Sequence, residues 1–157
     1  MRLEQGQGLP KQLRFLVVAH LVLVLLLVII SVGIWVPTGE QRLLITRFFN
    51  GLTGLYLLSM CSIYFSAARQ NQVQDGTQKA LGLPLILAFI AQFFPNISGL
   101  LLLWLANGWL MLLEATPTHK SRWPVPWQTA RRQQGVLLLV ALTSTLVAVY
   151  TRGYVYG

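Results

Sequence analysis

Long apolar runs alternate with short polar segments along the whole chain. A helix of about 20 apolar residues is needed to cross the roughly 30 Å hydrocarbon core of a membrane. The runs predict membrane-spanning helices at residues 15–36, 48–68, 80–94, 97–115 and 135–151. We therefore predict an all-α integral membrane protein, a five-span helical bundle that forms a single transmembrane domain over residues 1–157. Its third and fourth helices are expected to form a short hairpin.

Turn residues set two of the expected helix boundaries. Thr38 is followed three residues later by Gln41, which fits a capping box and predicts a helix start near Gly39. Pro95 cannot continue the helix before it, and Asn96 is a favourable N-cap for the helix after it. The apolar stretch is therefore expected to break at this proline.

The stretch from Ala80 to Ala115 carries no charge before Glu114. As one helix it would rise about 54 Å at 1.5 Å per residue, nearly twice the thickness of the hydrocarbon core. We therefore expect two crossings rather than one. The first arm is barely long enough to cross, so a re-entrant hairpin with its turn inside the bilayer is the alternative. Such a turn is stable only where protein covers it.

The distribution of Lys and Arg supports two crossings. A single crossing would place six basic residues on each side of the membrane, whereas two crossings place nine on the N-terminal side and three on the other. The positive-inside rule then predicts a cytoplasmic N-terminus and a periplasmic C-terminus in a bacterial-type inner membrane. The net charge of +8 is explained by these loops and by anionic lipid, so nucleic acid is not an expected partner.

Composition leaves little room for catalytic chemistry. The chain is 55% hydrophobic and 10% charged, whereas soluble domains carry about 25% charged residues. Cys61 is the single cysteine, and no metal-ligand spacing, catalytic triad or glycine-rich phosphate loop is present in the sequence. We expect no catalytic residue, no metal and no cofactor, and the composition favours a non-enzyme over a membrane enzyme, which stays open as a third alternative.

Two ionisable residues lie close to the predicted spans. His20 is interpreted as an interfacial histidine satisfied by water or backbone, because a haem ligand needs a second axial residue and no convincing pair exists. Glu114 ends the fourth span and is expected to pair with a nearby Lys or Arg. Between their flanks, the predicted spans contain no Asp, Glu, Lys or Arg.

Small and hydroxyl-bearing residues recur at helical spacing in the second and fifth spans. Such residues let helix backbones approach closely and hydrogen-bond across an interface. We therefore predict that these two spans form the main internal interface, through Asn50, Gly51, Gly54, Ser62 and Ser66 on one side and Ala141, Ser144, Thr145 and Ala148 on the other.

Three amides lie within or beside the third and fourth spans, namely Gln92, Asn96 and Asn107. An unpaired amide in hydrocarbon is costly, so inter-helix hydrogen bonding is the simpler interpretation. A polar pocket for a headgroup or a quinone is the alternative.

The segment "HKSRWPVPWQTARR" is the distinctive surface feature of the sequence. Indole rings favour the headgroup layer, and basic residues favour anionic lipid. We predict a loop lying flat on the cytoplasmic membrane surface, where it anchors the protein to anionic lipid or contacts a partner through Lys120, Arg122, Trp123, Trp127, Arg131 and Arg132.

Two functional hypotheses fit these features. The leading one is a non-catalytic accessory, assembly or scaffold subunit of a larger inner-membrane complex, with a membrane-protein partner. The alternative is a small-solute or lipid transporter or channel that acts as a homo-oligomer and is built around the three amides. Both place the chain in the bilayer, in contact with anionic lipid.

Overall fold

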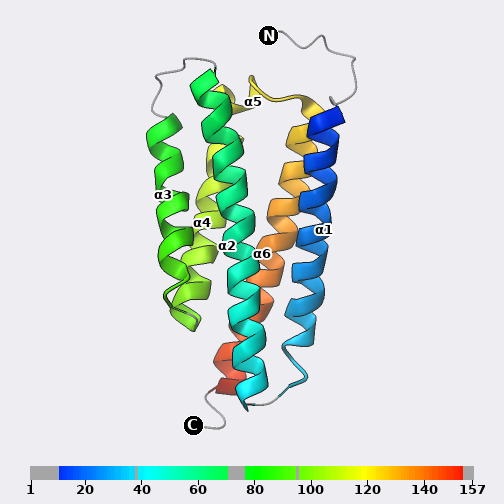
Figure 1. Ribbon diagram of the computed structural model, residues 1–157, viewed down its shortest axis with the longest axis vertical. Helices are drawn as coiled ribbons and strands as arrows, with labels where there is room; N and C mark the ends of the chain where they lie inside the picture. The colour runs from blue at the N-terminus through cyan, green and yellow to red at the C-terminus, as the bar shows by residue number, and fades with distance from the viewer. Residues whose placement is uncertain (1–10, 38, 71–76, 95, 154–157) are drawn as a thin grey trace.

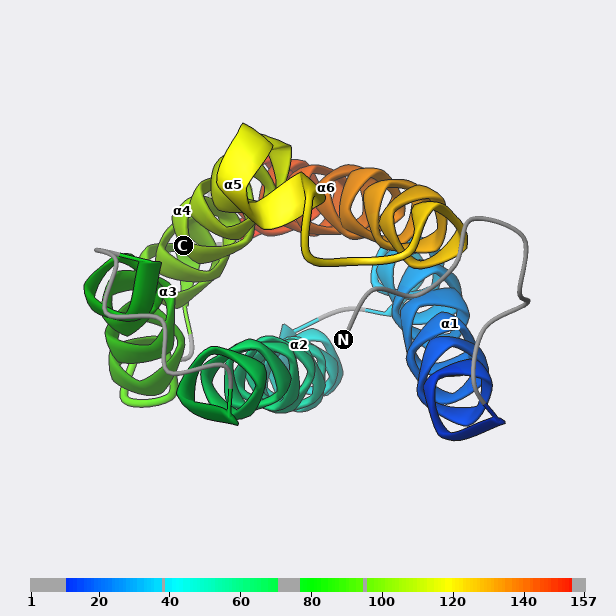
Figure 2. The ribbon, with the colours of Figure 1, turned by 90° about the horizontal axis from the view of Figure 1, so that it is seen from above.

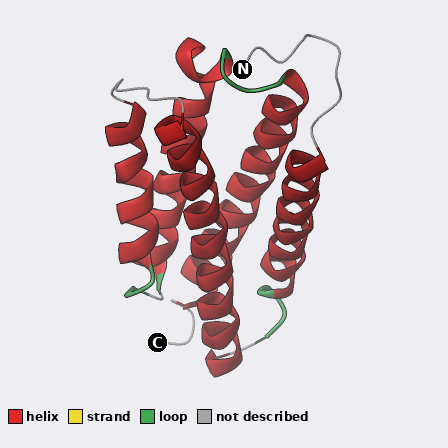
Figure 3. Ribbon diagram, turned by 45° about the horizontal axis from the view of Figure 1, so that its top comes forward, coloured by secondary structure: helices red, strands yellow, loops and turns green. Residues whose placement is uncertain are grey.

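The computed structural model describes residues 11–37, 39–70, 77–94 and 96–153, and these residues form helices and short connections without strands (Figure 3). The helices are α1 (Lys11–Gly33), α2 (Gly39–Gln70), α3 (Thr77–Ala91), α4 (Ile97–Ala115), α5 (Pro117–Lys120) and α6 (Val125–Gly153). By length and composition, α1, α2, α4 and α6 are long and apolar enough to cross a membrane, whereas α3 is shorter.

Apart from the short α5, the helices run alternately up and down, so that α1 begins at the end of the bundle that carries α5 and α6 finishes at the other (Figure 1). Seen from above, they form a ring in the order α1, α6, α4, α3 and α2 (Figure 2). Each helix packs against its neighbours in this ring, and α2 also contacts α4. Consequently α2 and α6 face each other from opposite sides of the bundle.

Helix α1 contributes one face to the core of the bundle. Its buried residues recur at alternating spacings of four and three, which places them on one face of a helix: His20, Val24, Leu27, Ser31 and, just beyond the helix, Ile34. The remaining surface is Leu, Val and Ile and is largely exposed. An apolar exterior of this kind suits contact with lipid.

Two arginines satisfy backbone carbonyls where α1 ends. Arg42 on α2 donates to the carbonyl oxygens of Ile34 (3.3 Å) and Pro37, and Arg152 on α6 donates to that of Trp35 (2.5 Å). The last carbonyls of a helix have no partner inside the helix, so basic side chains stabilise them. These bonds attach the α1–α2 connection to both neighbouring helices.

Several boundaries differ from the sequence prediction. Helix α2 begins at Gly39 as predicted, although Thr38 of the expected capping box lies outside the described residues. Helix α6 begins at Val125, ten residues before the predicted span at 135, and tolerates Pro126 because prolines are accepted in a first helical turn. The segment predicted to lie flat therefore folds into α5 and the first turns of α6.

The predicted pairing of small-residue faces also differs from the observed arrangement. Among the predicted residues, Asn50, Gly54, Ala141, Thr145 and Ala148 are buried, whereas Gly51, Ser62 and Ser66 are exposed. Gly54 faces α3, and Ser144 accepts a hydrogen bond from the indole N–H of Trp35 on α1 (3.1 Å). Because α2 and α6 lie on opposite sides of the ring, long side chains connect them instead of close backbone contacts.

The apolar stretch between residues 80 and 115 is broken into α3 and α4, which pack against each other. Asn96 is the N-cap residue of α4, but its side chain makes no capping hydrogen bond. Gly99 lies against the end of α3, where an added Cβ would stand 1.7 Å from the carbonyl oxygen of Phe94 and 2.8 Å from that of Ala91. Only glycine fits this contact without backbone movement.

We predict that Gly99→Ala destabilises the protein by about 1–3 kcal/mol, because the new methyl group overlaps backbone atoms that have no rotamer by which to escape. The matched control is Gly108→Ala in the same helix, where an added Cβ meets nothing within 4 Å. That variant should gain about 0.5–1 kcal/mol from helix propensity. Thermal unfolding in detergent compares the two, and equal midpoints would contradict the assigned close approach.

Candidate functional site

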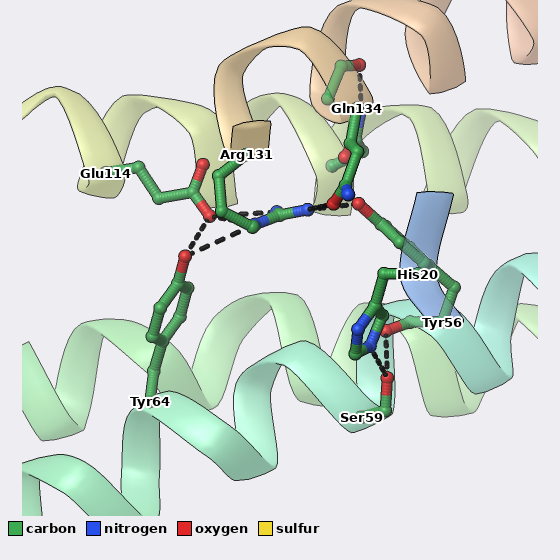
Figure 4. Close-up of polar contacts among 9 residues, drawn as sticks. His20, Tyr56, Ser59, Tyr64, Glu114, Arg131 and Gln134 are labelled. Atoms are coloured by element: carbon green, nitrogen blue, oxygen red, sulfur yellow. Dashed lines mark hydrogen bonds and ion pairs between the residues drawn. The ribbon is translucent and has the colours of Figure 1, made fainter. Parts of the chain in front are cut away.

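Arg131 lies inside the bundle, in the first two turns of α6, and Figure 4 shows it among Tyr64, Glu114 and Gln134. Its side chain is 2% exposed, and Trp127 one turn earlier is 1% exposed. Residues 127, 131, 134 and 138 follow the spacing of one helix face, and the structure buries all of them. Because α6 begins at Val125, this face enters the bundle together with its charge.

Arg131 is hydrogen-bonded through all three guanidinium nitrogens. Nε and Nη2 donate to Oε1 of Glu114 on α4, at 3.0 and 2.8 Å. Nη1 donates to Oε1 of Gln134 (3.1 Å) and to the hydroxyl of Tyr56, and Nε also reaches the hydroxyl of Tyr64 (3.3 Å). The Tyr64 hydroxyl in turn donates to Glu114. We refer to these five residues as the Arg131 network.

The Arg131 network connects four helices. Tyr56 and Tyr64 belong to α2, Glu114 to α4, and Arg131 and Gln134 to α6. Nε2 of Gln134 donates to the backbone carbonyl of Val17 on α1 (3.1 Å), which adds the fourth helix. A buried charge is costly unless it is paired and its remaining donors are bonded, so this arrangement fixes the relative positions of these helices.

His20 is buried beside this network. Its Nδ1 lies 2.7 Å from the backbone oxygen of Leu16, and its Nε2 lies 2.8 Å from Oγ of Ser59 on α2. The ring also contacts the edge of Tyr56, with centroids 5.5 Å apart. Both ring nitrogens thus have partners within the chain, which fits a structural role better than ligation of a haem.

An aromatic cluster attaches α5 to the end of the bundle. The Tyr64 ring meets the edges of His119 and Trp123, with centroids 4.6 and 5.2 Å apart, and Trp123 stacks on Trp127 at 5.1 Å. Burial lowers the pKa of His119, an effect that the nearby Glu114 carboxylate opposes. His119 is therefore expected to be neutral at pH 7.

A pocket of about 370 Å³ lies between this cluster and the Arg131 network, lined by residues of α2, α4, α5 and α6. Its charged lining residues are Glu114, Lys120, Arg131 and Arg132. Ligand sites typically enclose about 300–1,000 Å³, so this pocket can hold a small molecule or a headgroup. Among the described residues, no group of three or more His, Cys, Asp or Glu side chains is placed to hold a metal ion.

The six residues of the predicted membrane-surface segment have separate locations. Lys120 and Arg132 are exposed and line the pocket, and Arg122 and Trp123 are partly buried. Trp127 and Arg131 are interior residues, contrary to the predicted surface position. The physical reason is helical: residues four apart on α6 share a face, and the carboxylate of Glu114 lies on the inner side of that face.

The three predicted amides do not come together in one pocket. Gln92 donates to the backbone oxygens of Ala88 (3.0 Å) and, on α2, Asn50 (3.4 Å), and Asn107 donates to that of Gly135 on α6 (3.1 Å). The bonds to Asn50 and Gly135 are the inter-helix hydrogen bonds of the simpler interpretation, whereas the bond to Ala88 is local. Asn96 is exposed in the turn before α4, and none of the three lines the pocket beside the Arg131 network.

Sequence reasoning missed Tyr56, Tyr64 and Gln134 as members of the site. A signal was available, because Tyr56, Met60 and Tyr64 recur every fourth residue and therefore place two hydroxyls on one face of a helix. The expected pairing of Glu114 with a basic residue is confirmed by its ion pair with Arg131.

Comparison with known proteins identifies no relative of this chain. No protein-family model matches the chain, and no curated protein or solved structure shows significant similarity to it.

We predict that Glu114→Gln lowers the free energy of unfolding by about 3–5 kcal/mol, because it leaves the buried Arg131 without its carboxylate. Glu114→Met combined with Arg131→Met should cost less than Glu114→Gln alone, since no charge is then left buried. Exposed Glu40→Gln is the control and should change stability by less than about 0.5 kcal/mol. Reversible unfolding in micelles measures all three, and a double variant that is less stable than the single one would contradict the coupling.

Proposed function

We propose that the protein is a non-catalytic accessory, assembly or scaffold subunit of a larger inner-membrane complex. The polar groups best suited to chemistry, those of the Arg131 network and His20, are engaged in contacts among the chain's own helices. Their arrangement supports a fixed bundle rather than a reacting centre. A fixed bundle suits a subunit that positions a partner.

The observation that carries this proposal is the exposed turn between α3 and α4. From Ala80 to Ala91 the apolar part of α3 rises only about 18 Å, against about 30 Å of hydrocarbon. Figure 1 draws the turn above the lower ends of α2 and α6. Gln92 and Asn96 in this turn are exposed, together with Phe93 and Phe94.

Irregular backbone at membrane depth is tolerated only where protein covers it or where it lines a water-filled cavity. A transmembrane helix of a partner protein, packed against Phe93 and Phe94, would cover this turn. The two phenylalanines supply apolar contact area, and the side-chain oxygen of Gln92 and the amide of Asn96 supply hydrogen-bonding groups for a polar residue on that helix.

We predict that a photo-crosslinking residue in place of Phe93 forms an adduct with a second protein in native membranes. Ile29 on α1 provides a matched control, because it is 68% exposed and Phe93 is 69% exposed. The Ile29 probe should react with lipid alone. Mass spectrometry of the adducts formed at positions 93 and 29 distinguishes protein from lipid. Only lipid adducts at Phe93 would contradict the proposal.

The proposed topology has five membrane-embedded helices, with the N-terminus in the cytoplasm and the C-terminus in the periplasm. Helices α1, α2 and α6 cross, and α3 and α4 form a short hairpin that begins and ends on the cytoplasmic side. It is supported by the charges of the described helices and connections. Eight basic residues belong to segments at the α5 end, namely Lys11, Arg14, Arg69, Lys79, Lys120, Arg122, Arg131 and Arg132, and three to the other end, namely Arg42, Arg47 and Arg152. The positive-inside rule assigns the α5 end to the cytoplasm.

We predict that a reporter fused after Gly157 is active in the periplasm and that one fused after Lys120 is active in the cytoplasm. Along the chain, Lys120 precedes α6 and Gly157 follows it. Paired phosphatase and fluorescent-protein fusions measure both sides. A cytoplasmic signal at Gly157 together with a cytoplasmic N-terminus would require an even number of crossings and would rule out the proposed topology.

A transporter or channel that acts as a homo-oligomer is the second candidate, and one observation favours it. Within the described residues, side-chain atoms of Asn50, Thr53 and Asn107 are buried without a hydrogen-bond partner. Buried polar atoms without partners cost free energy unless water or a solute reaches them. Crosslinks from Phe93 to a second copy of this chain would favour this candidate over an accessory subunit.

A further inference from the structure

The pocket between α5 and the Arg131 network carries an excess of positive charge. The acidic residue that lines this pocket is Glu114, and its carboxylate already accepts hydrogen bonds from Arg131 and Tyr64. Lys120 and Arg132 line the same pocket, are exposed, and take no part in the Arg131 network. Two cations at the opening are therefore available to an anion.

The indole N–H of Trp127 provides a second and independent indication of a ligand. Trp127 lines the pocket, and within the described part of the chain its Nε1–H has no hydrogen-bond partner although the residue is 1% exposed. An indole nitrogen only donates, so its missing partner is an acceptor. Leaving such a donor buried and unpaired is unfavourable, whereas a bound oxygen would satisfy it.

Hydrophobic groups form the other part of the wall. Met111 and Ala115 of α4 and the ring of Tyr64 line the pocket beside the charged groups. Residues of α5 line the pocket, and α5 lies at one end of the bundle (Figure 1). Lipid headgroups contact a membrane protein at the ends of its apolar helices. Basic pockets between transmembrane helices on the cytoplasmic side are suited to anionic headgroups.

We propose that this pocket binds the phosphate group of an anionic phospholipid. Lys120 and Arg132 neutralise the headgroup, the Trp127 N–H donates to one of its oxygens, and Met111 and Ala115 contact the glycerol and the first methylenes of the acyl chains. The site does not depend on the role proposed for the α3–α4 turn. It serves equally in a subunit of a complex and in a homo-oligomer.

Short-chain phosphatidylglycerol, titrated into the full-length protein in a non-ionic detergent, tests the proposal by thermal stabilisation. The same titration with short-chain phosphatidylcholine and with inorganic phosphate distinguishes the charged headgroup from a zwitterionic lipid and from a free anion. We expect saturable stabilisation by phosphatidylglycerol and at least tenfold weaker effects of the other two. Equal stabilisation by phosphatidylcholine, or by inorganic phosphate, would overturn the assignment to an anionic lipid.

The variants separate this site from general surface charge. Lys120→Gln combined with Arg132→Gln should weaken phosphatidylglycerol binding at least tenfold, because each cation near an anionic headgroup contributes appreciably. Arg69→Gln combined with Lys79→Gln removes the same charge from exposed positions at the same end of the bundle and should leave binding unchanged. Equal losses of phosphatidylglycerol affinity in the two double variants would overturn the proposal.

Trp127→Phe keeps an aromatic ring and removes only the N–H donor. It should weaken phosphatidylglycerol binding several-fold while the unfolding midpoint without lipid stays within a few degrees of the parent. Unchanged affinity would remove the hydrogen bond from the proposed site. If the midpoint of Trp127→Phe falls far below that of the parent, the proposal is decided by comparing the Lys120 and Arg132 double variant with the Arg69 and Lys79 double variant, because all four side chains are exposed.

Discussion

The ion pair between Arg131 and Glu114 is the interaction on which the rest of the bundle depends. A guanidinium group that is 2% exposed must have its charge balanced and its donors bonded. One carboxylate and three neutral side chains do this, and they come from α2, α4 and α6. Each of these helices has few rotations and few axial positions that allow all of the bonds at once. The network therefore sets the register of a mainly apolar bundle, whose Leu and Val contacts are far less directional.

The same ion pair determines the form of the α5 end. Drawing Arg131 inward also draws in Trp127, which lies one turn earlier on the same face of α6. Trp127 then stacks on Trp123, and Trp123 and His119 contact Tyr64, whose hydroxyl is bonded to Glu114. The pocket is the space left between this aromatic cluster and the buried charges. The shape of the pocket is thus a consequence of the network, and the exposed Lys120 and Arg132 make its charge positive.

The sequence predicted the apolar helices well, because uninterrupted apolar runs and turn residues are local signals. The start of α2 at Gly39 and the break before Ile97 followed from residues within a few positions of each boundary. The inward position of Arg131 was not predicted, because composition alone assigns a segment with four basic residues to the surface. Its burial depends on partners 17 and 75 residues away, Glu114 and Tyr56, and no local pattern specifies them. Only the four-residue spacing of Trp127 and Arg131 hinted at a helix face that extends into the core.

The small-residue rule was misapplied for a related reason. Small residues allow two helices to touch, but they do not identify which helices are neighbours. Gly54 is close to α3 and Gly99 is close to the end of that helix, so the closest glycine contacts lie around the short hairpin. The opposed pair α2 and α6 is joined by an arginine and two tyrosines, side chains long enough to cross the interior. The long polar side chains lie near the α5 end, and a glycine meets backbone carbonyls at the hairpin end. The pocket beside α5 and the exposed α3–α4 turn are therefore at opposite ends of the bundle, so the proposed lipid headgroup and the proposed partner helix would not compete for the same surface.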